Sequence, residues 1–154
     1  MTISIEPADL GDLEFADFLR AHLRDLAPTA PPESRHALDL DGLRAAGVRV
    51  WIARVQGRIV GTVAIAPVET GHVELKSMRT DPGWRGRGIA SSLLMHAMVE
   101  ARRAGASRMS LETGSMDFFE PARLLYARHG FAVTAPFGRY RPDPNSVFMS
   151  RRIS

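Results

Sequence analysis

The chain has 154 residues, no cysteine and a net charge of +3 at pH 7. This fits one domain spanning residues 1–154, which is long enough to bury a core without cross-links. Without cysteine there is no disulfide, thiol nucleophile or Cys-based zinc site, and we expect no metal. With no membrane-length apolar run and no signal-peptide pattern, we expect a cytoplasmic protein that binds no membrane.

The basic residues do not form a concentrated run. Lys76 is the only lysine among the twenty Lys and Arg residues, and the arginines are spread along the chain. Aromatic residues are not interleaved with them, as they are on nucleic-acid stacking surfaces. We therefore expect no nucleic-acid partner.

The first third of the chain predicts a strand and two helices. Ile3 and Ile5 alternate with a polar residue, which is typical of a short strand. Asp9 is the expected N-cap of a helix through about residue 25, and Pro28 breaks that helix. Its apolar positions are Leu10, Leu13, Phe15, Phe18, Leu19, Leu23 and Leu26. A shorter helix is expected over about residues 39–45.

Strands and helices then alternate to the end of the chain. Three strands, at residues 48–55, 58–66 and 73–80, predict an antiparallel meander with a tight turn at Gln56-Gly57. The later elements are a helix (89–104), a strand (107–113), a helix between Pro121 and Gly130, and two final strands (131–134 and 146–152). The helical crossover can place strand 107–113 parallel to strand 73–80.

A glycine-rich turn joins strand 73–80 to the helix that follows it. The first amides of a helix have no partner inside the helix, and the macrodipole is positive there, so such a turn favours anions. Gly86 and Gly88 remove side chains that would keep a phosphate away, and Arg85 and Arg87 add charged donors. We interpret the turn as a diphosphate site, although it matches neither the P-loop nor the dinucleotide fingerprint.

Two motifs carry a family resemblance. Arg85-x-x-Gly88-x-Ala90 resembles the Arg/Gln-x-x-Gly-x-Gly/Ala signature of the GCN5-related N-acetyltransferases (GNAT superfamily). Leu125-Tyr126 with Gly130-Phe131 resembles the family's Leu-Tyr-x-x-x-Gly-Phe signature. The order βααβββαβαββ also matches, which implies an α+β fold: a twisted mixed sheet of six to seven strands flanked by about four helices. Segments such as 75–80 resemble a bacterial branch typified by YsnE.

The resemblance implies acetyl-CoA as the co-substrate. Its pantetheine arm would enter between two splayed strands and pair with the backbone of Met78, Arg79 and Thr80, and an N–H near Met78 would bind the oxyanion. Its pyrophosphate would lie on Arg85, Gly86, Arg87, Gly88, Ile89 and Ala90. One departure is Phe119, which stands where the family often has an asparagine, so that Ser115 or Asp117 would have to replace that polar contact.

The catalytic residues implied by the resemblance are Tyr126 and Glu74. Tyr126 would be the general acid that protonates the thiolate. The alternative interpretation is a tyrosine that packs its ring in the core and has no catalytic role. Glu74 would be the base, directly or through a water. The alternative interpretation is a glutamate on the surface of the strand that pairs with an arginine. Glu112 is the rival base, and His72 could relay protons.

The expected reaction is direct attack of a primary amine of a small molecule or peptide on acetyl-CoA in a ternary complex. Candidate substrate-binding residues are Glu33, Ser34, Arg35, His36, Glu112, Arg139 and Tyr140. Arginine suits a carboxylate-bearing acceptor, although these residues could be solvated loop charges. A non-catalytic acyl-CoA-binding module is the alternative function. The resemblance leaves both a monomer and a homodimer open.

Overall fold

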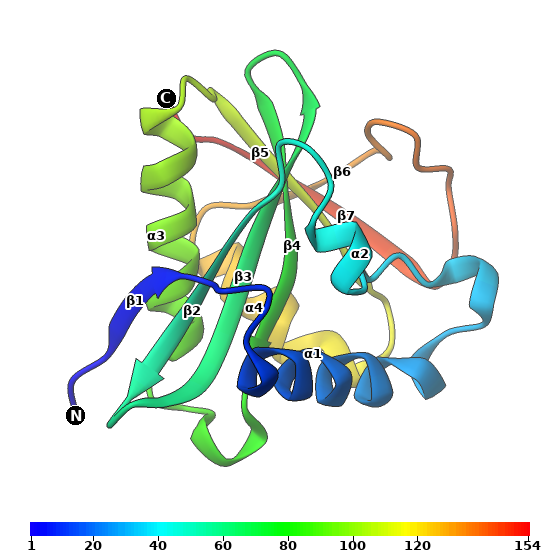
Figure 1. Ribbon diagram of the computed structural model, residues 1–154. Coiled ribbons are helices and arrows are strands. Elements are labelled where there is room, and N and C mark those ends of the chain that lie inside the picture. The colour runs from blue at the N-terminus through cyan, green and yellow to red at the C-terminus, as the bar shows by residue number, and fades with distance from the viewer.

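The computed structural model describes residues 1–154 and contains one seven-stranded sheet with helices on both faces (Figure 1). The elements are β1 (Ser4–Pro7), α1 (Leu13–Leu26), α2 (Leu40–Leu43), β2 (Arg49–Val55), β3 (Arg58–Glu69), β4 (His72–Thr80), α3 (Ile89–Arg103), β5 (Arg108–Gly114), α4 (Glu120–Arg128), β6 (Ala132–Thr134) and β7 (Ser146–Arg152). The strand order is β1-β2-β3-β4-β5-β7-β6. The expected α+β class, the antiparallel meander and the parallel pairing of β4 with β5 are confirmed.

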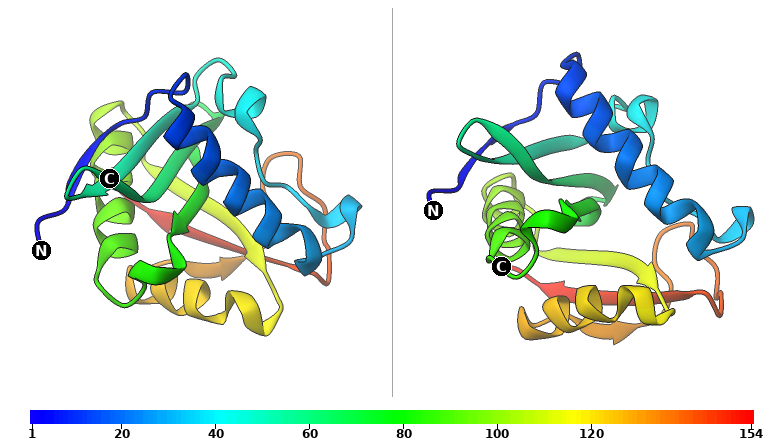
Figure 2. Two further views of the ribbon diagram at one scale, coloured as in Figure 1. Left: turned by 60° about the horizontal axis from the view of Figure 1, so that its bottom comes forward. Right: turned by 90° about the horizontal axis from the view of Figure 1, so that it is seen from below.

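Helices cover both faces of the sheet, as the views in Figure 2 show, and a cluster of buried apolar residues lies on each face. On one face, Phe15 and Leu19 of α1 and Leu43 of α2 pack in a cluster of seven buried residues. On the other face, α3 and α4 close a larger cluster of 21 buried residues, which includes Tyr126. Burial of apolar surface on both faces holds the four helices against the sheet.

The first helix begins later than the sequence predicts. Asp12, and not Asp9, is the N-cap, and its side chain accepts a hydrogen bond from Glu14 N. Asp9 instead accepts a 2.9 Å hydrogen bond from Gly11 N in the preceding turn. The expected apolar position Leu13 is 79% exposed, whereas His22 is buried at 7%. The buried face of α1 therefore includes His22 and leaves Leu13 outside it.

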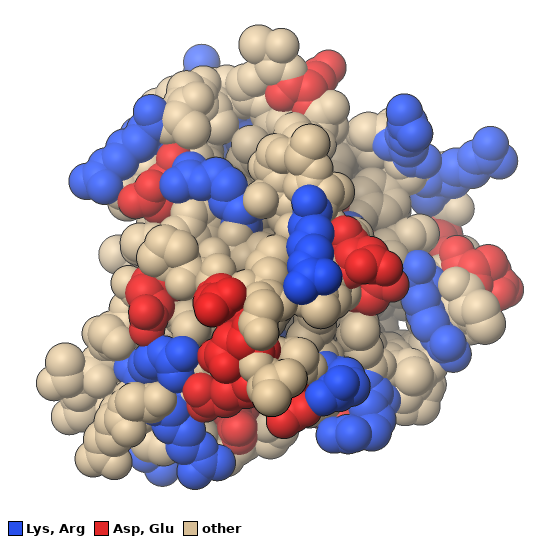
Figure 3. All heavy atoms as spheres, in the orientation of Figure 1, with Lys and Arg blue, Asp and Glu red and all other residues tan.

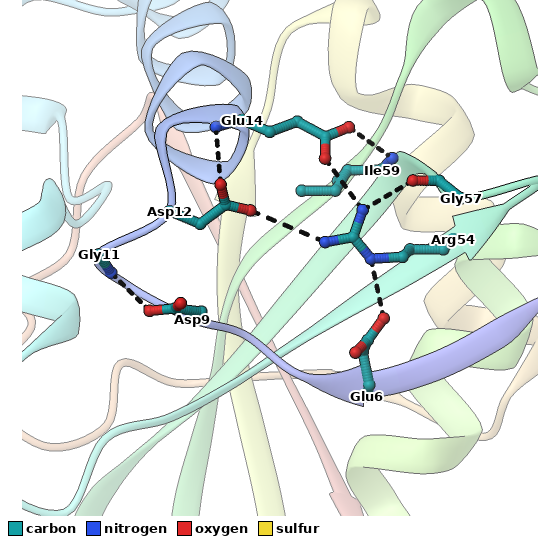
Figure 4. A network of polar contacts seen from close by, with 8 residues as sticks. All are labelled: Glu6, Asp9, Gly11, Asp12, Glu14, Arg54, Gly57 and Ile59. Atoms are coloured by element: carbon teal, nitrogen blue, oxygen red, sulfur yellow. Dashed lines mark hydrogen bonds and ion pairs between the residues drawn. The ribbon is translucent and has the colours of Figure 1, made fainter.

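An arginine on β2 ties the first strand, the first helix and the β2–β3 hairpin together (Figure 4). Arg54 donates to Glu6 Oε1 at 2.8 Å, to Glu14 Oε1 at 2.9 Å and to the Gly57 carbonyl oxygen at 2.8 Å. Asp12 Oδ2 lies 3.7 Å from its Nη2. The other oxygen of Glu14 accepts from Ile59 N at 3.1 Å, so one carboxylate joins α1 to β3.

Gly61 of β3 determines how closely α3 approaches the sheet. A Cβ atom at this position would lie 2.8 Å from Leu93 and 2.9 Å from Ile89, both on α3. Because no side chain occupies that space, the first turns of α3 pack directly on the β3 backbone. The N-terminus of α3 is thereby held beside the end of β4.

The sheet opens between β4 and β5. The two strands pair only over His72–Arg108, Val73–Met109 and Glu74–Ser110, and the rest of β4 has no partner on β5. The β4 register against β3 also shifts here, because Lys76 and Arg79 oppose Ala64 and Thr62. Ser77 lies in this bulge with φ of +54°, a conformation uncommon for serine. The expected splay of the two strands is therefore present.

Acidic and basic side chains are mixed on the face of the molecule drawn in Figure 3. No helix of the chain combines the length and the apolar character that crossing a bilayer requires.

Candidate active site

The turn before α3 has a backbone conformation that leaves room for an anion. Gly86 and Gly88 have φ of +74° and +81°, and no atom lies within 4 Å of a Cβ built on either residue. Gly88 is the N-cap of α3 without any side-chain hydrogen bond to the helix. A diphosphate could therefore approach the backbone closely at both positions.

The amides at the start of α3 are also available to bind an anion. The first main-chain hydrogen bond of the helix runs from Ser92 N to Gly88 O at 3.0 Å. The preceding amides, including those of Ile89 and Ala90, have no acceptor inside the helix. Arg87 stacks over Trp84 at 4.7 Å from its ring centroid. These features fit the pyrophosphate of coenzyme A.

The end of β4 lies next to this turn. Ser77 Oγ and Thr80 Oγ1 are buried and have no hydrogen-bond partner. The Arg79 side chain donates to Asp25 of α1 at 2.8 Å and is only 9% exposed. The Arg79 side chain is therefore held on α1, although its buried Nε has no hydrogen-bond partner.

A cavity of about 350 Å³ opens where β4 and β5 separate. It brings together the predicted residues Ser34, Arg35, His36, Glu74, Met78, Glu112 and Tyr126. A second cavity, of about 610 Å³, is lined by Glu33, Arg139 and Tyr140 and shares His36 and Glu74 with the first. The predicted substrate residues therefore fall into two groups on either side of Glu74. Neither cavity includes the predicted cofactor residues Arg79, Thr80 or Arg85 through Ala90 in its lining.

The predicted base, Glu74, lies in a cluster of three polar groups. Its Oε2 accepts a short hydrogen bond from the Tyr140 hydroxyl and one of 3.4 Å from Lys76 Nζ. Lys76 Nζ also donates to the Tyr140 hydroxyl at 3.0 Å. The Glu74 and Lys76 side chains are only 12% and 11% exposed. Glu74 is thus an ion-paired carboxylate inside the fold rather than a solvated strand residue.

Glu112 of β5 is the second carboxylate of the cavity. Its Oε2 accepts a 2.7 Å hydrogen bond from Ser146 Oγ of β7. Burial raises the pKa of Glu112 to about 7, although the bond from Ser146 and the charge of Lys76 oppose the shift. This carboxyl group can gain and lose a proton near neutral pH.

Tyr126 of α4 is 6% exposed and lines the same cavity. Its ring packs against Phe131 with the centroids 5.9 Å apart. Burial raises the pKa of Tyr126 far above its ordinary value, and the charge of Glu112 raises it further. The phenol is therefore neutral at physiological pH and remains a proton donor.

His72 lies outside both cavities. Its Nε2 is 2.6 Å from Ser110 Oγ, and Ser110 Oγ is 2.9 Å from Ser150 Oγ. The ring thus joins β4 to β5 at the end where these strands are paired. This position supports a structural role for His72.

The polar contact suggested in place of the family's asparagine is not formed by Ser115. Its hydroxyl donates to the Pro144 carbonyl oxygen at 2.7 Å, and neither Ser115 nor Asp117 lines the cavity. The Phe119 ring lines it instead and packs against Gly114, where a Cβ atom would lie within 2.0 Å of that ring. This part of the cavity wall is apolar.

Lys76 and His22 are among the residues of the cavity for which the sequence predicts no role. Lys76 could have been singled out as the one lysine in an arginine-rich chain. His22 lies three and seven residues after Leu19 and Phe15, which is the spacing of one helical face. Burial lowers the pKa of His22 to about 4, and the nearby charge of Arg79 acts in the same direction. Its ring is therefore uncharged at neutral pH.

Comparisons with known proteins show the family to which the chain belongs. The family model described as "Acetyltransferase (GNAT) family" matches residues 14–131. YsnE of Bacillus subtilis, described as an uncharacterized N-acetyltransferase, is 41% identical over 94% of this chain and 96% of its own. An IAA acetyltransferase of Azospirillum brasilense is 43% identical over 84% of each chain.

Solved structures share the fold. The PaiA N-acetyltransferase of Thermoplasma acidophilum, solved in complex with coenzyme A, has a TM-score of 0.75 at 15% identity and covers 99% of each chain. An acetyltransferase of the GNAT family from Staphylococcus aureus has a TM-score of 0.79 at 20% identity over 99% of this chain and 100% of its own. Because the family model spans more than half of the sequence, the chain belongs to the GNAT family of acetyltransferases.

Proposed function

We propose that this chain transfers the acetyl group of acetyl-CoA to a primary amine of a small molecule or peptide, in a ternary complex. The observation that supports this most is the gap between β4 and β5. It opens beside the free amides of α3 and leads into a cavity that holds two carboxylates and a neutral tyrosine. The chain has no cysteine that could carry an acyl-enzyme intermediate. We also expect the protein to act in the cytoplasm.

The proposed grip on acetyl-CoA uses backbone more than side chains. The amides of Gly88, Ile89 and Ala90 would bind the pyrophosphate, with Arg85, Gly86 and Arg87 beside them. The β4 backbone at Met78, Arg79 and Thr80 would pair with the pantetheine arm, and an N–H at Met78 would stabilise the oxyanion. Acetyl-CoA supplies the activated thioester.

The side chains of the cavity would move the protons. A carboxylate, Glu74 or Glu112, would take the proton that the attacking amine loses. Tyr126 would donate a hydrogen bond to the departing sulfur and then a proton to the thiolate. Because a thiol has a pKa of about 8.5 and burial raises the pKa of Tyr126 far above its ordinary value, this transfer is uphill and is completed when solvent returns a proton to Tyr126.

The charges of the cavity favour an acceptor that carries a carboxylate beside its amine. Arg35 and Lys76 line the cavity together with the two glutamates, so the lining is not an acidic funnel for a polycation. The Arg35 side chain is fixed through Nε, which donates to the Ala30 carbonyl oxygen at 2.8 Å and leaves its terminal nitrogens available. Ser34, His36 and Glu33, with Arg139 and Tyr140 of the second cavity, would complete the acceptor site.

The test is a thiol-release assay with acetyl-CoA and a panel of free amino acids, their amides, peptides, polyamines and aminoglycosides. We expect thiol release that depends on the acceptor and is faster with an amino acid than with its amide. If the protein binds acetyl-CoA tightly but releases no coenzyme A thiol with any acceptor, the result would instead favour the alternative function, a non-catalytic acyl-CoA-binding module.

A further inference from the structure

The two carboxylates of the cavity, Glu74 and Glu112, accept hydrogen bonds from different kinds of donor. Glu74 Oε2 accepts hydrogen bonds from both the Tyr140 hydroxyl and the Lys76 ammonium group. Glu112 Oε2 accepts from the neutral hydroxyl of Ser146. The charge of Glu74 is therefore neutralised at short range, whereas no cation donates a hydrogen bond to Glu112.

The position of Glu112 also differs from that of Glu74. Glu74 pairs with Ser110 at the last point of contact between β4 and β5, and Glu112 lies two residues farther along β5, beyond that contact. Leu111, Thr113 and Gly114 line the cavity beside it. Glu112 is thus on the wall of the gap itself, in the cavity that Tyr126 also lines.

We propose that Glu112, and not Glu74, is the general base that accepts the proton of the attacking amine. This rests on the proposed acetyltransferase function. As the amine nitrogen bonds to the thioester carbon and the C–S bond breaks, the N–H proton passes to Glu112 and the thiolate takes a proton from Tyr126. Proton exchange with solvent then restores both groups. Glu74 is a positioning residue that fixes Lys76 and Tyr140.

The electrostatic surroundings of Glu112 agree with this role. A base works best when its pKa is near the operating pH, and burial raises the pKa of Glu112 to about 7. The groups that influence or feel its charge are Glu74 and Lys76 of β4, Tyr126 of α4, Tyr140 and Asp143 of the β6–β7 connection, and Ser146 of β7. Of these, Lys76 and Ser146 favour the charged form, and Glu74 and Asp143 disfavour it.

The experiment is the pH profile of kcat/KM for the wild type, Glu112→Gln and Glu74→Gln, with acetyl-CoA and the fastest acceptor of the panel. We expect the wild-type rate to rise with pH through about 7 because Glu112 must lose its proton. Glu112→Gln should lower kcat by about 10²- to 10⁴-fold and remove this rise. Glu74→Gln should keep the rise, even if KM increases.

Two controls keep the outcome clear. Ser146→Ala removes the hydrogen bond that favours the charged form of Glu112, so the rise should move up by about one pH unit. A second acceptor with a different amine pKa should leave the rise in place, since it belongs to the enzyme. Calorimetry with coenzyme A confirms that each variant is folded.

The possible failures are distinguishable. A rise that persists in Glu112→Gln and disappears in Glu74→Gln would overturn the assignment while leaving the acetyltransferase function intact. Absence of thiol release by the wild type with every acceptor would remove the function, and the base assignment with it.

Discussion

Ser34 donates a 2.5 Å hydrogen bond to Oδ2 of Asp143, a residue 109 positions later in the chain. Asn145 Nδ2 lies 3.3 Å from the same serine oxygen, and Asn145 N donates to Asp143 Oδ1 at 2.8 Å. These bonds join the α1–α2 connection to the β6–β7 connection. Because Ser34 and Asn145 line the first cavity and Asp143 the second, the contact fixes the wall around the expected acceptor site.

Ser34→Ala should therefore weaken acceptor binding without affecting coenzyme A. One lost hydrogen bond to a charged group predicts an acceptor KM about three- to tenfold higher. Steady-state kinetics with a varied acceptor, together with coenzyme A calorimetry, would measure both effects. An equal loss of affinity for coenzyme A would show that the contact supports the whole fold instead.

Tyr126→Phe should keep the packing of the ring and remove only the hydroxyl group. We expect kcat to fall by about 10²-fold or more, with coenzyme A affinity unchanged, because a general acid acts in the transition state. Tyr140→Phe is a useful comparison, since that hydroxyl bonds to Glu74. An unaltered kcat in Tyr126→Phe, under conditions where chemistry limits the rate, would exclude Tyr126 as the acid.

Gly88→Ala should impair the binding of coenzyme A. The new Cβ would occupy the space in front of the helix amides, and positive φ costs an alanine about 1 kcal/mol. We expect affinity for coenzyme A to fall by about tenfold or more. Gly57→Ala is the matched control, because Gly57 has a similar φ of +78° and open surroundings in the β2–β3 turn. Comparable affinity losses in both variants would count against a phosphate site at α3.

Glu112 should make the protein less stable at alkaline pH. Its folded pKa of about 7 lies above the ordinary value of 4.5, so the folded state binds the proton more tightly. The free energy of unfolding then falls as pH rises from about 4.5 and levels off above about 7. Glu112→Gln should therefore raise the free energy of unfolding at about pH 8, by up to about 3 kcal/mol, and have little effect at about pH 4.

Urea unfolding at the two pH values measures this difference. If Glu112→Gln destabilised the fold equally at both pH values, burial would not disfavour the charged form of this carboxyl group. Stabilisation by a substitution that abolishes activity is the pattern expected of a functional group.

Arg54→Ala should destabilise the N-terminal half of the fold. Three hydrogen bonds to Glu6, Glu14 and Gly57 would be lost, but the pairs are partly exposed, so we expect about 1–2 kcal/mol. Because the bond from Ile59 and the pair with Arg54 lower the pKa of Glu14, the contribution of Glu14 is present above its unfolded pKa and is lost as pH falls below it. Denaturant midpoints at neutral and acidic pH would measure both effects.

The control for this network is Arg20→Ala, which removes an exposed pair with Asp17 on α1. Its denaturant midpoint should stay within error of the wild type. If Arg54→Ala left the denaturant midpoint equally unchanged, the contacts around Arg54 would not contribute to the stability of the fold.

The sequence predicts the architecture well because the signals for it are local. Strand alternation, the Gln56-Gly57 turn and the glycine-rich turn before α3 each depend on residues close together in the chain. The sequence predicts Asp9 as the N-cap of α1, but the structure has Asp12 there. Both are equally good capping residues, and the turn at Gly11 decides between them. Propensity alone cannot make that choice.

The composition of the site was less predictable because it depends on distant pairs. The sequence favours Glu74 as the base and leaves Glu112 as its rival, and only the contacts of Lys76, Tyr140 and Ser146 show how their surroundings differ. The burial that raises the pKa of Glu112 arises where β4 and β5 separate. No spacing within the chain encodes that environment.

Calorimetric comparison of coenzyme A with pantetheine tests the central claim most directly, because it requires no knowledge of the acceptor. Both share the arm expected between β4 and β5, but only coenzyme A carries the diphosphate expected on the amides of α3. We predict that coenzyme A and dephospho-coenzyme A both bind, and that pantetheine binds at least about a hundredfold more weakly. Equal affinity for pantetheine, or no binding of coenzyme A, would contradict the account.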